Sequence, residues 1–477
     1  MTHDVVIVGA GPVGLFLAIE LKAAGANPLV VERLAEADGA LKAAAVGAVA
    51  AEALQRRGLG PALDEAHRAT MAAMAPALKA RFGSTAVKKP GGHFSAIFQI
   101  DQELQRDPER HLRAVPQEAL EKLLNARARE LEIEVRRGVT LEGFEQESDA
   151  VSAQTSAGPL RARYLVGCDG GRSKVRKLAG FEFPGTEPTI TGYQIAAELD
   201  APEKLPQGWH RTAHGLIASA PGRVFTAEFR GPPPPRDAPI AREEVEAAIQ
   251  RLSGTDVKIR SLTRATRWTD NARQATTYRL GRVLLAGDAA HVHSPFGGQG
   301  LNLGLVDAAN LGFKLATAVR GGEQLLDSYT AERHPVAARV LENTRAQVAL
   351  IRPDPLTSAL RAVVSDLMKL PEGNRYFGEM LSGVGTRYDL GDDDPLVGTL
   401  AKDRALALSD GRQERLYALM EKSGGGLFIS PSQRALPPRV RHAHTEAGPS
   451  LLVRPDGCIA WTDASSTSAD DALARWF

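Results

Sequence analysis

Three short apolar runs, each followed directly by a turn that contains glycine, occur at widely separated positions in the chain. They are Val5 to Val8, Tyr164 to Val166 and Val283 to Ala286. Unbroken apolar runs of this length, rich in β-branched residues, are typical of parallel strands buried on both faces. The strand-like segments YQIAAEL and RVFTAEF, between Thr186 and Arg264, indicate a further sheet.

The first run begins a complete strand–turn–helix–strand unit. Gly9, Gly11 and Gly14 form the pattern GxGxxG after it. The first glycine permits the tight turn, the second lets the backbone approach a pyrophosphate, and the third allows close packing of the helix on the strand. The second strand ends at Glu32, where a carboxylate is placed to bind an adenosine ribose. A turn that merely closes a βαβ unit is the alternative, but all parts of the unit agree on dinucleotide binding. This unit alone does not distinguish an NAD-binding site from an FAD-binding site.

The second run ends in Cys168-Asp169-Gly170-Gly171, and a basic segment follows. Such a turn places a carboxylate and backbone N–H groups at a dinucleotide. Taken alone, it is better explained as a strand, a glycine turn and a solvated basic helix with a purely structural role.

The third run ends in Gly287-Asp288, whose carboxylate is suited to a ribityl or ribose hydroxyl. Pro295 and the glycines after it, Gly297, Gly298 and Gly300, let the backbone pass against a flat ring without a Cβ in the way. Leu301 and Asn302 then begin a helix whose N-terminus would stabilise negative charge on that ring. We therefore expect this segment to hold a flavin.

Length and composition indicate an ordinary protein of more than one domain. The chain has 477 residues, 43% of them hydrophobic and 24% charged, which is too long for a single core. A net charge of +1 argues against nucleic acid or an acidic membrane as a partner. Two distant cysteines, Cys168 and Cys458, make a disulfide framework unexpected and favour the cytoplasm. His291 and His293 lack a third ligand cluster, so hydrogen-bonded loop histidines are expected there rather than a metal site.

The three motifs, in this order and spacing, resemble those of the class A FAD-dependent monooxygenases of the para-hydroxybenzoate hydroxylase type. The similarity is closest to the bacterial subgroup that acts on aromatic polyketides, tetracycline precursors and rifamycins. Three further segments resemble that subgroup: AERHPVAARVLENTRAQ from Ala331, NRY from Asn374 and LLVRPDGCIAWT from Leu451.

The resemblance implies a set of cofactor-binding residues. The GxGxxG turn and the acid after it bind the ADP half of FAD, the Asp-Gly turn contacts FAD and the passing nicotinamide cofactor, and the Gly-Asp turn holds the ribityl–pyrophosphate region. The full set is Gly9, Gly11, Pro12, Gly14, Glu32, Arg33, Lys42, Arg113, Gln117, Leu141, Asp169, Gly170, Gly287, Asp288, Pro295, Gly298, Gly300, Leu301 and Asn302. Two departures stand out: Val49 replaces a usual arginine, which leaves Lys42 as the only cation from Leu41 to Glu52, and Phe313 replaces a common tryptophan.

The expected architecture is an α/β fold with a discontinuous Rossmann-like FAD domain, an inserted β-sheet substrate domain and a thioredoxin-like C-terminal domain without CxxC. The corresponding ranges are 1–185 and 265–393 for the FAD domain, 186–264 for the substrate sheet and 394–477 for the C-terminal domain. Within the first range, Leu41 to Leu59 is expected to be an alanine-rich helix. A loop insertion is expected near Met71 to Phe98, where periodicity is weak, and its segment KARFGSTAVKKPGG, from Lys79 to Gly92, is expected to be mobile. Gly231 to Pro239 is expected to be a polyproline-like connector.

The function that the resemblance implies is hydroxylation of a polycyclic aromatic compound by a flavin C4a-hydroperoxide, formed from O₂ after NAD(P)H reduces FAD. A phenolate substrate supplies its own electron push, so no catalytic acid or base is assigned. Pro295, Gly297 and Gly298 are expected only to contact the flavin face. Baeyer–Villiger oxygenation and a non-catalytic flavin-binding accessory role are the alternatives. Monomer or homodimer, no nucleic-acid partner and no membrane are expected.

Overall fold

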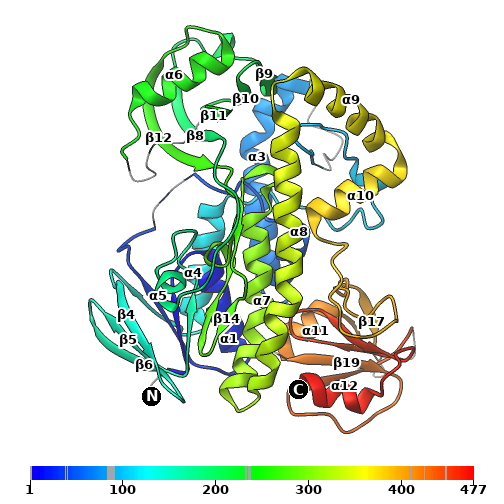
Figure 1. Ribbon diagram of the computed structural model, residues 1–477. Helices are drawn as coiled ribbons and strands as arrows, with labels where there is room; N and C mark the ends of the chain where they lie inside the picture. The colour runs from blue at the N-terminus through cyan, green and yellow to red at the C-terminus, as the bar shows by residue number, and fades with distance from the viewer. Residues whose placement is uncertain are drawn as a thin grey trace.

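The computed structural model describes residues 3–37, 39, 41–82, 92–230, 234, 238–408, 411–423, 425–445 and 448–477. Most of Gly231–Pro239, the predicted connector, lies outside the described residues. Figure 1 shows α7 (Gly300–Val319) and α8 (Asp327–Ile351) side by side through the middle of the molecule, with the other units arranged around them.

A six-stranded sheet forms the centre of the largest unit, in the order β14-β15-β7-β1-β2-β3. All neighbours pair in parallel except β14 with β15. The strands are β1 (Val5–Val8), β2 (Pro28–Glu32), β3 (Glu134–Arg137), β7 (Tyr164–Gly167), β14 (Arg279–Leu280) and β15 (Val283–Leu285). Gly167 is in register with both Val8 and Leu285. The three predicted turns therefore leave the sheet at the same carboxyl edge, which is where open parallel sheets bind ligands.

Helices cover this sheet, and α1 packs closely against α7. A Cβ at Gly304 would approach the Val13 side chain of α1 to 2.7 Å, so small residues allow the two helices to meet. Besides α7, the helices of this unit are α1 (Pro12–Ala23), α2 (Ala48–Gln55), α3 (Gly60–Phe82), α4 (Gln117–Glu130) and α5 (Lys174–Ala179). Smaller sheets are formed by β4 (Leu141–Gln146), β5 (Val151–Thr155) and β6 (Gly158–Ala162), and by β13 (Arg273–Gln274) with β16 (His291–Val292). The short 3-10 helices are η1 (Gln102–Leu104), η2 (Pro202–Lys204), η3 (Gly287–Ala289), η4 (Phe296–Gly298) and η5 (Glu323–Leu326).

Two of the local predictions are wrong. The expected helix from Leu41 begins only at Ala48, because Gly47 is extended and Val46 makes a β-bridge with Arg113. The loop expected from Met71 is helical as far as Phe82, since α3 is one continuous helix. Its alanine, leucine and methionine content favours a helix even where the apolar periodicity is weak. Residues 83–91 lie outside the described part of the chain.

A second, antiparallel sheet has the order β12-β8-β11-β10-β9. Its strands are β8 (Thr191–Leu199), β9 (Gly208–Thr212), β10 (Gly215–Ala220), β11 (Arg223–Glu228) and β12 (Ile259–Thr269). One face packs on α6 (Arg242–Ser253) through Ile195, Ile217 and Val224. Because side chains alternate along a strand, Gln194 and Phe225 point to the opposite face.

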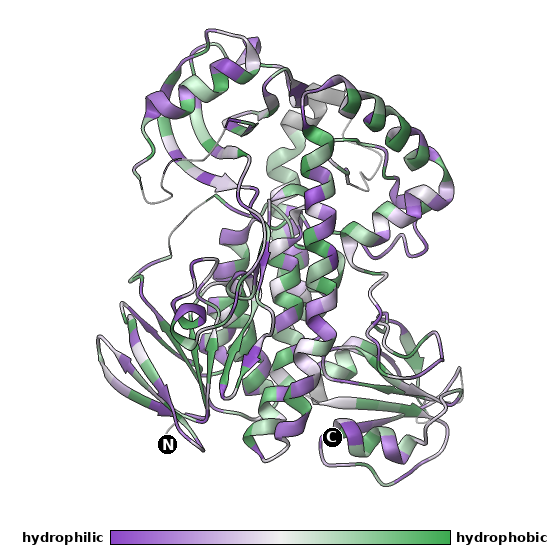
Figure 2. Cartoon of the chain, viewed as in Figure 1, coloured by the Kyte–Doolittle hydropathy of each residue, from purple (hydrophilic) through white to green (hydrophobic). Residues whose placement is uncertain are grey.

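The C-terminal unit lies against the C-terminal half of α7 and the N-terminal part of α8 (Figure 1). It contains a four-stranded sheet in the order β20-β19-β21-β22, and Arg454 in its β21–β22 connection forms buried ion pairs with Glu332 of α8. Figure 2 shows hydrophobic residues on α9, and Leu356 and Val363 of this helix are exposed. The elements after α8 are α9 (Pro355–Lys369), α10 (Pro371–Ser382), β17 (Ala405–Ala407), β18 (Gln413–Arg415), α11 (Leu416–Ser423), β19 (Gly426–Ser430), β20 (Val440–His444), β21 (Leu451–Val453), β22 (Ile459–Thr462) and α12 (Ala469–Trp476). The predicted α/β fold class is confirmed.

Candidate functional site

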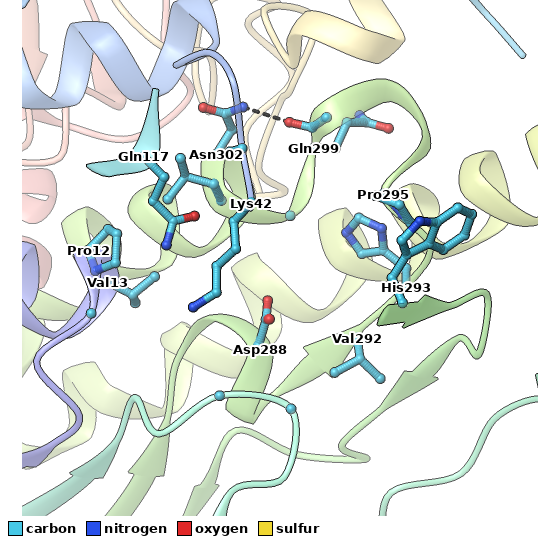
Figure 3. Close-up of a pocket in the computed structure, with 18 of the residues that line it drawn as sticks. Pro12, Val13, Lys42, Gln117, Asp288, Val292, His293, Pro295, Gln299 and Asn302 are labelled. Carbon is cyan, nitrogen blue, oxygen red and sulfur yellow. Dashed lines mark hydrogen bonds between the residues drawn. The ribbon is translucent and has the colours of Figure 1, made fainter. Parts of the chain in front are cut away.

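A cavity of about 1460 Å³ extends from the carboxyl edge of the six-stranded sheet to the inner face of the five-stranded sheet. All three predicted turns contribute to its wall. Figure 3 shows the side chains of Lys42, Gln117 and Asp288 directed into the same part of this cavity. Residues from three distant parts of the sequence thus face one space.

The GxGxxG turn forms one end of the cavity. Gly9 has a φ of +108°, and a Cβ there would come within 2.4 Å of the Cys168 carbonyl oxygen. Gly11, in contrast, has no atom near its missing Cβ and lines the cavity. Gly14 does not line it, because its missing Cβ would overlap the Gly9 carbonyl. The first and third glycines therefore serve packing, and the second leaves space for a ligand at the N-terminus of α1.

Glu32 supports the same turn from the end of β2. Its Oε2 atom accepts a hydrogen bond from the Ala10 backbone N–H at 2.9 Å, and Oε1 accepts one from Leu34 at 2.9 Å. A carboxylate has about four acceptor sites, so further lone pairs are available to a ligand hydroxyl. Glu32 thus shapes the glycine turn and also lines the cavity.

Asp169 follows β7 by two residues and accepts hydrogen bonds from the first turn of the short helix α5, whose N-cap residue is Ser173. Its Oδ2 atom accepts backbone hydrogen bonds from Lys174 at 2.6 Å and Val175 at 3.1 Å. Its Oδ1 atom has no hydrogen-bond partner within the described residues, and burial raises the pKa of this carboxyl. The adjacent Gly170 has a φ of +79° and open space around its missing Cβ. An orphaned carboxylate oxygen beside open backbone fits a dinucleotide with hydroxyl groups.

The two residues of the Gly-Asp turn after β15 have different roles: Gly287 bonds α7, and Asp288 lines the cavity. The Gly287 N–H donates to Asp307 Oδ2 of α7 at 3.1 Å, and Gly287 does not line the cavity. Asp288 does line it. Asp307 is fully buried and also bonds His291 at 2.7 Å, which accounts for the first histidine of the HVH sequence. No group of side chains among the described residues could hold a metal ion.

The loop from Pro295 to Gly300 passes along the cavity before α7 begins. Gly297 and Gly298 have φ values of +78° and +63°, which favour glycine, and a Cβ at Gly298 would meet nothing within 4 Å. Asn302 ties this loop to the segment before α2, since it accepts from Gly47 N–H at 2.6 Å and donates to the Gly298 carbonyl at 2.8 Å. The open backbone, together with the N-terminus of α7, fits a flat, electron-rich ring.

The remaining predicted residues lie at the cavity with one exception. Arg113 is absent from the wall; its guanidinium pairs with Asp64 at 2.9 Å instead. Arg110, three residues earlier, lines the wall but pairs with Glu52 at 2.7 Å. Pro12, Arg33, Lys42, Gln117, Leu141, Gly300 and Leu301 line the cavity.

The wall opposite the turns is aromatic, and sequence reasoning missed it. Trp209, Phe225 and Trp268 come from β9, β11 and β12, and Phe296 follows Pro295. The register places Trp209, Phe225, Gln194 and Thr266 in one row across the sheet, through Ala218. The alternation of apolar and polar residues in RVFTAEF indicated that Phe225 lies on one face of a strand. The sequence did not show which strands are neighbours in the sheet, so the aromatic wall could not be predicted.

Comparison with known proteins matches the chain to a family model described as FAD binding domain, over residues 2–344. The 12-dehydrotetracycline 5-monooxygenase/anhydrotetracycline 6-monooxygenase of Streptomyces rimosus is 40% identical, over 100% of this chain and 99% of that protein. The rifampicin monooxygenase of Streptomyces venezuelae is 36% identical, over 99% and 98%. The solved structure of the anhydrotetracycline hydroxylase OxyS from Streptomyces rimosus has a TM-score of 0.84 at 38% identity, covering 100% of this chain and 99% of that chain.

Among the helices of the described residues, none has the length and apolar character needed to cross a membrane.

Proposed function

This chain belongs to the FAD-binding-domain family of flavin-dependent monooxygenases, and we propose that it uses NAD(P)H and O₂ to hydroxylate a polycyclic aromatic compound. FAD is its cofactor. The tetracycline and rifampicin monooxygenases that it resembles support this substrate class.

One observation carries the proposal: the aromatic wall and the open glycine loop are adjacent in a single cavity. Phe296 follows Pro295 in that loop, and its ring lies edge-on to Trp268 with 5.5 Å between ring centroids. A flat substrate on the aromatic wall would therefore lie next to the loop proposed to face the flavin. Aromatic rings favour such stacking through both area and quadrupole effects.

Bound FAD supplies the redox chemistry that activates O₂ for transfer of one oxygen atom. The chain's own residues bind, orient and shield. The buried rings of Trp268 and Phe296 exclude water from the reacting region. A phenol that ionises provides its own electron push, so the proposal assigns no side chain as catalytic acid or base.

We propose the following division of the cofactor contacts. Gly11, Pro12, Glu32 and Arg33 hold the ADP half, with the backbone of Leu141 at the adenine. Asp169 and Asp288 bind hydroxyl groups of the central part, and Lys42, Gln117 and the loop from Pro295 to Asn302 hold the flavin end. Gly14 and Gly287 act through packing. The domain ranges predicted from the sequence, the cytoplasmic location and the oligomeric state stay predictions.

NAD(P)H oxidation under air tests the proposal, followed with and without polycyclic phenols while products are analysed by mass spectrometry. Phenol-dependent oxidation and a product with one added oxygen atom are expected. Protein that is yellow but never bleached by NADH or NADPH would instead favour the accessory role. Insertion of the oxygen next to a ring carbonyl, located by NMR, would identify Baeyer–Villiger chemistry.

A further inference from the structure

The aromatic wall of the cavity is a continuous chain of ring contacts. Ring centroids are 4.9 Å apart for His93 and Trp209, 5.1 Å for Trp209 and Phe225, and 5.1 Å for Phe225 and Trp268. Phe225 and Trp268 are stacked, with 18° between their planes. Such a wall accepts a flat, fused-ring ligand but by itself does not orient it within the plane.

Trp268 is held in one position, and its polar atom is unpaired. Gly192 lies opposite it in the β8–β12 register, and a Cβ there would overlap the indole, so glycine provides the seat for this ring. Phe225 and Phe296 contact its other sides. The indole Nε1 is buried and has no acceptor within the described part of the chain. A buried N–H is normally paired, and Trp268 is one of the residues that line the cavity.

His93, at the other end of the ring chain, presents a second donor. Its Nδ1 atom accepts a hydrogen bond from the Ala96 backbone N–H at 3.2 Å. Burial lowers the pKa of His93 to about 4, so the ring is neutral at neutral pH. A neutral imidazole that accepts at Nδ1 carries its proton on Nε2. His93, which lines the cavity, therefore carries an N–H donor on Nε2.

We propose that Trp268 Nε1 and His93 Nε2 bind carbonyl oxygens on the rings of a polycyclic phenol and so position it on the aromatic wall. This specificity rests on the proposed function, since it names the substrate features that the same cavity selects. Both groups only donate in this arrangement, so they favour acceptor oxygens and disfavour a fused-ring system without carbonyls. A buried donor left unpaired penalises the wrong ligand. Because Trp268 adjoins Phe296, an oxygen held there brings the ring carbons beside it to the Pro295–Gly298 loop.

The test measures binding by the FAD-loaded enzyme without turnover, from the perturbation of flavin absorbance under anaerobic conditions. The probes are 1-hydroxyanthraquinone and 1-hydroxyanthracene, which share the fused rings and the phenol but differ in two carbonyl oxygens. We expect the quinone to bind roughly 25- to 100-fold more tightly, because two hydrogen bonds that each contribute about 5- to 10-fold are made only with its carbonyl oxygens. Trp268→Phe, which keeps an aromatic ring, should weaken quinone binding roughly 5- to 10-fold and leave 1-hydroxyanthracene within about 2-fold.

Two further variants make the result specific. Trp461→Phe is the matched control, because the Trp461 Nε1 donates to the Thr467 carbonyl in the C-terminal unit, outside the cavity wall; both affinities should be unchanged. His93→Phe should reproduce the loss of quinone affinity, and His93→Gln, which retains an N–H donor, should restore most of it. These variants also keep the test open if Trp268→Phe fails to fold.

Equal binding of the two probes by the native protein would overturn the proposal. So would an equal loss for both probes in Trp268→Phe, because that pattern reports stacking alone. The expected binding pattern without oxygenated product from any phenol would leave the donor assignment standing and refute the hydroxylase function. The two failures are therefore distinguishable.

Discussion

The Asp307 Oδ2 atom lies 3.1 Å from the backbone nitrogen of Gly287, so a carboxylate within α7 holds the turn that presents Asp288 to the cavity. The same carboxylate accepts from Arg333 Nε at 2.7 Å and bonds His291 at 2.7 Å. Burial acts to raise the pKa of Asp307, but Arg333 and His291 outweigh it and the pKa is lowered. A charged, fully paired group in the core thus fixes the position of a cofactor turn.

Asp307→Ala is expected to destabilise the protein and to reduce its FAD content. Removing one partner leaves Arg333 buried and uncompensated, which costs about 3–5 kcal/mol in buried pairs. Urea unfolding of the apoprotein and the flavin-to-protein absorbance ratio measure the two effects. Asp327→Ala is the control, since this carboxylate is 79% exposed in its pair with Arg279 and should cost less than about 1 kcal/mol.

Asp288→Ala is expected to lose FAD while the fold survives. This side chain faces the cavity, so its removal takes a contact from the ligand without opening the core. Equilibrium dialysis against FAD, with circular dichroism of the apoprotein, separates the two. Normal FAD affinity in the variant would show that the ribityl chain is placed wrongly.

Glu32→Ala should weaken FAD binding by roughly 1.5–3 kcal/mol for each charge-assisted hydrogen bond lost to the ligand. The Ala10 and Leu34 N–H groups would also lose their acceptor, so the glycine turn should loosen. Fluorescence titration with FAD measures the change. Glu145→Ala, which removes an exposed carboxylate on β4 that does not line the cavity, should leave FAD binding normal.

Gly298→Ala tests the open loop. Its φ of +63° costs any other residue about 1–2 kcal/mol, and its Cβ would enter the cavity rather than the core. We expect slower flavin reduction by NAD(P)H in stopped-flow measurements, because the methyl group narrows the space beside the proposed ring. Gly222→Ala is the matched control: it has a φ of +69°, equally open surroundings and a position in the β10–β11 turn. Gly222→Ala should lose a similar amount of stability but reduce its flavin at the native rate. Equal flavin reduction rates in the two variants would contradict the placement of the Gly298 loop beside the flavin ring.

Glu332 predicts how stability depends on acid. Burial acts to raise its pKa, but Arg454 and Lys314 lower it well below the usual 4.5. A carboxyl whose folded pKa is depressed stabilises the fold above its unfolded pKa, and the contribution is lost as the pH falls below about 4.5. The free energy of unfolding should therefore decrease with acid in the native protein. Glu332→Gln should be less stable at pH 7, and its stability should change less with pH below 4.5. If the free energy of unfolding, measured with urea, fell equally steeply with pH in Glu332→Gln and in the native protein, the assignment would be refuted.

The sequence by itself determined the elements whose information is local. The apolar runs before Gly9, Asp169 and Gly287 each specify a buried strand and its turn, because β-branched residues and glycine restrict the backbone over a few neighbours. From them the sequence predicted the α/β fold class and the glycine loop before α7. Sequence reasoning failed where propensity competes with context: Leu41 to Val46 is alanine-rich like a helix, yet Val46 pairs with Arg113 through long-range backbone hydrogen bonds.

Only the tertiary structure decided which residues share a site. The β8–β12 and β8–β11 pairings bring Gln194, Phe225 and Trp268 to one wall, although they are distant along the chain. Asp307 reaches Gly287 only because α7 packs beneath the turn, and Arg113 is turned to Asp64 by a neighbouring helix. Such contacts depend on strand order and helix packing, which the whole chain settles by burying its apolar faces together. Local pattern therefore specified the turns, and packing decided what faces them.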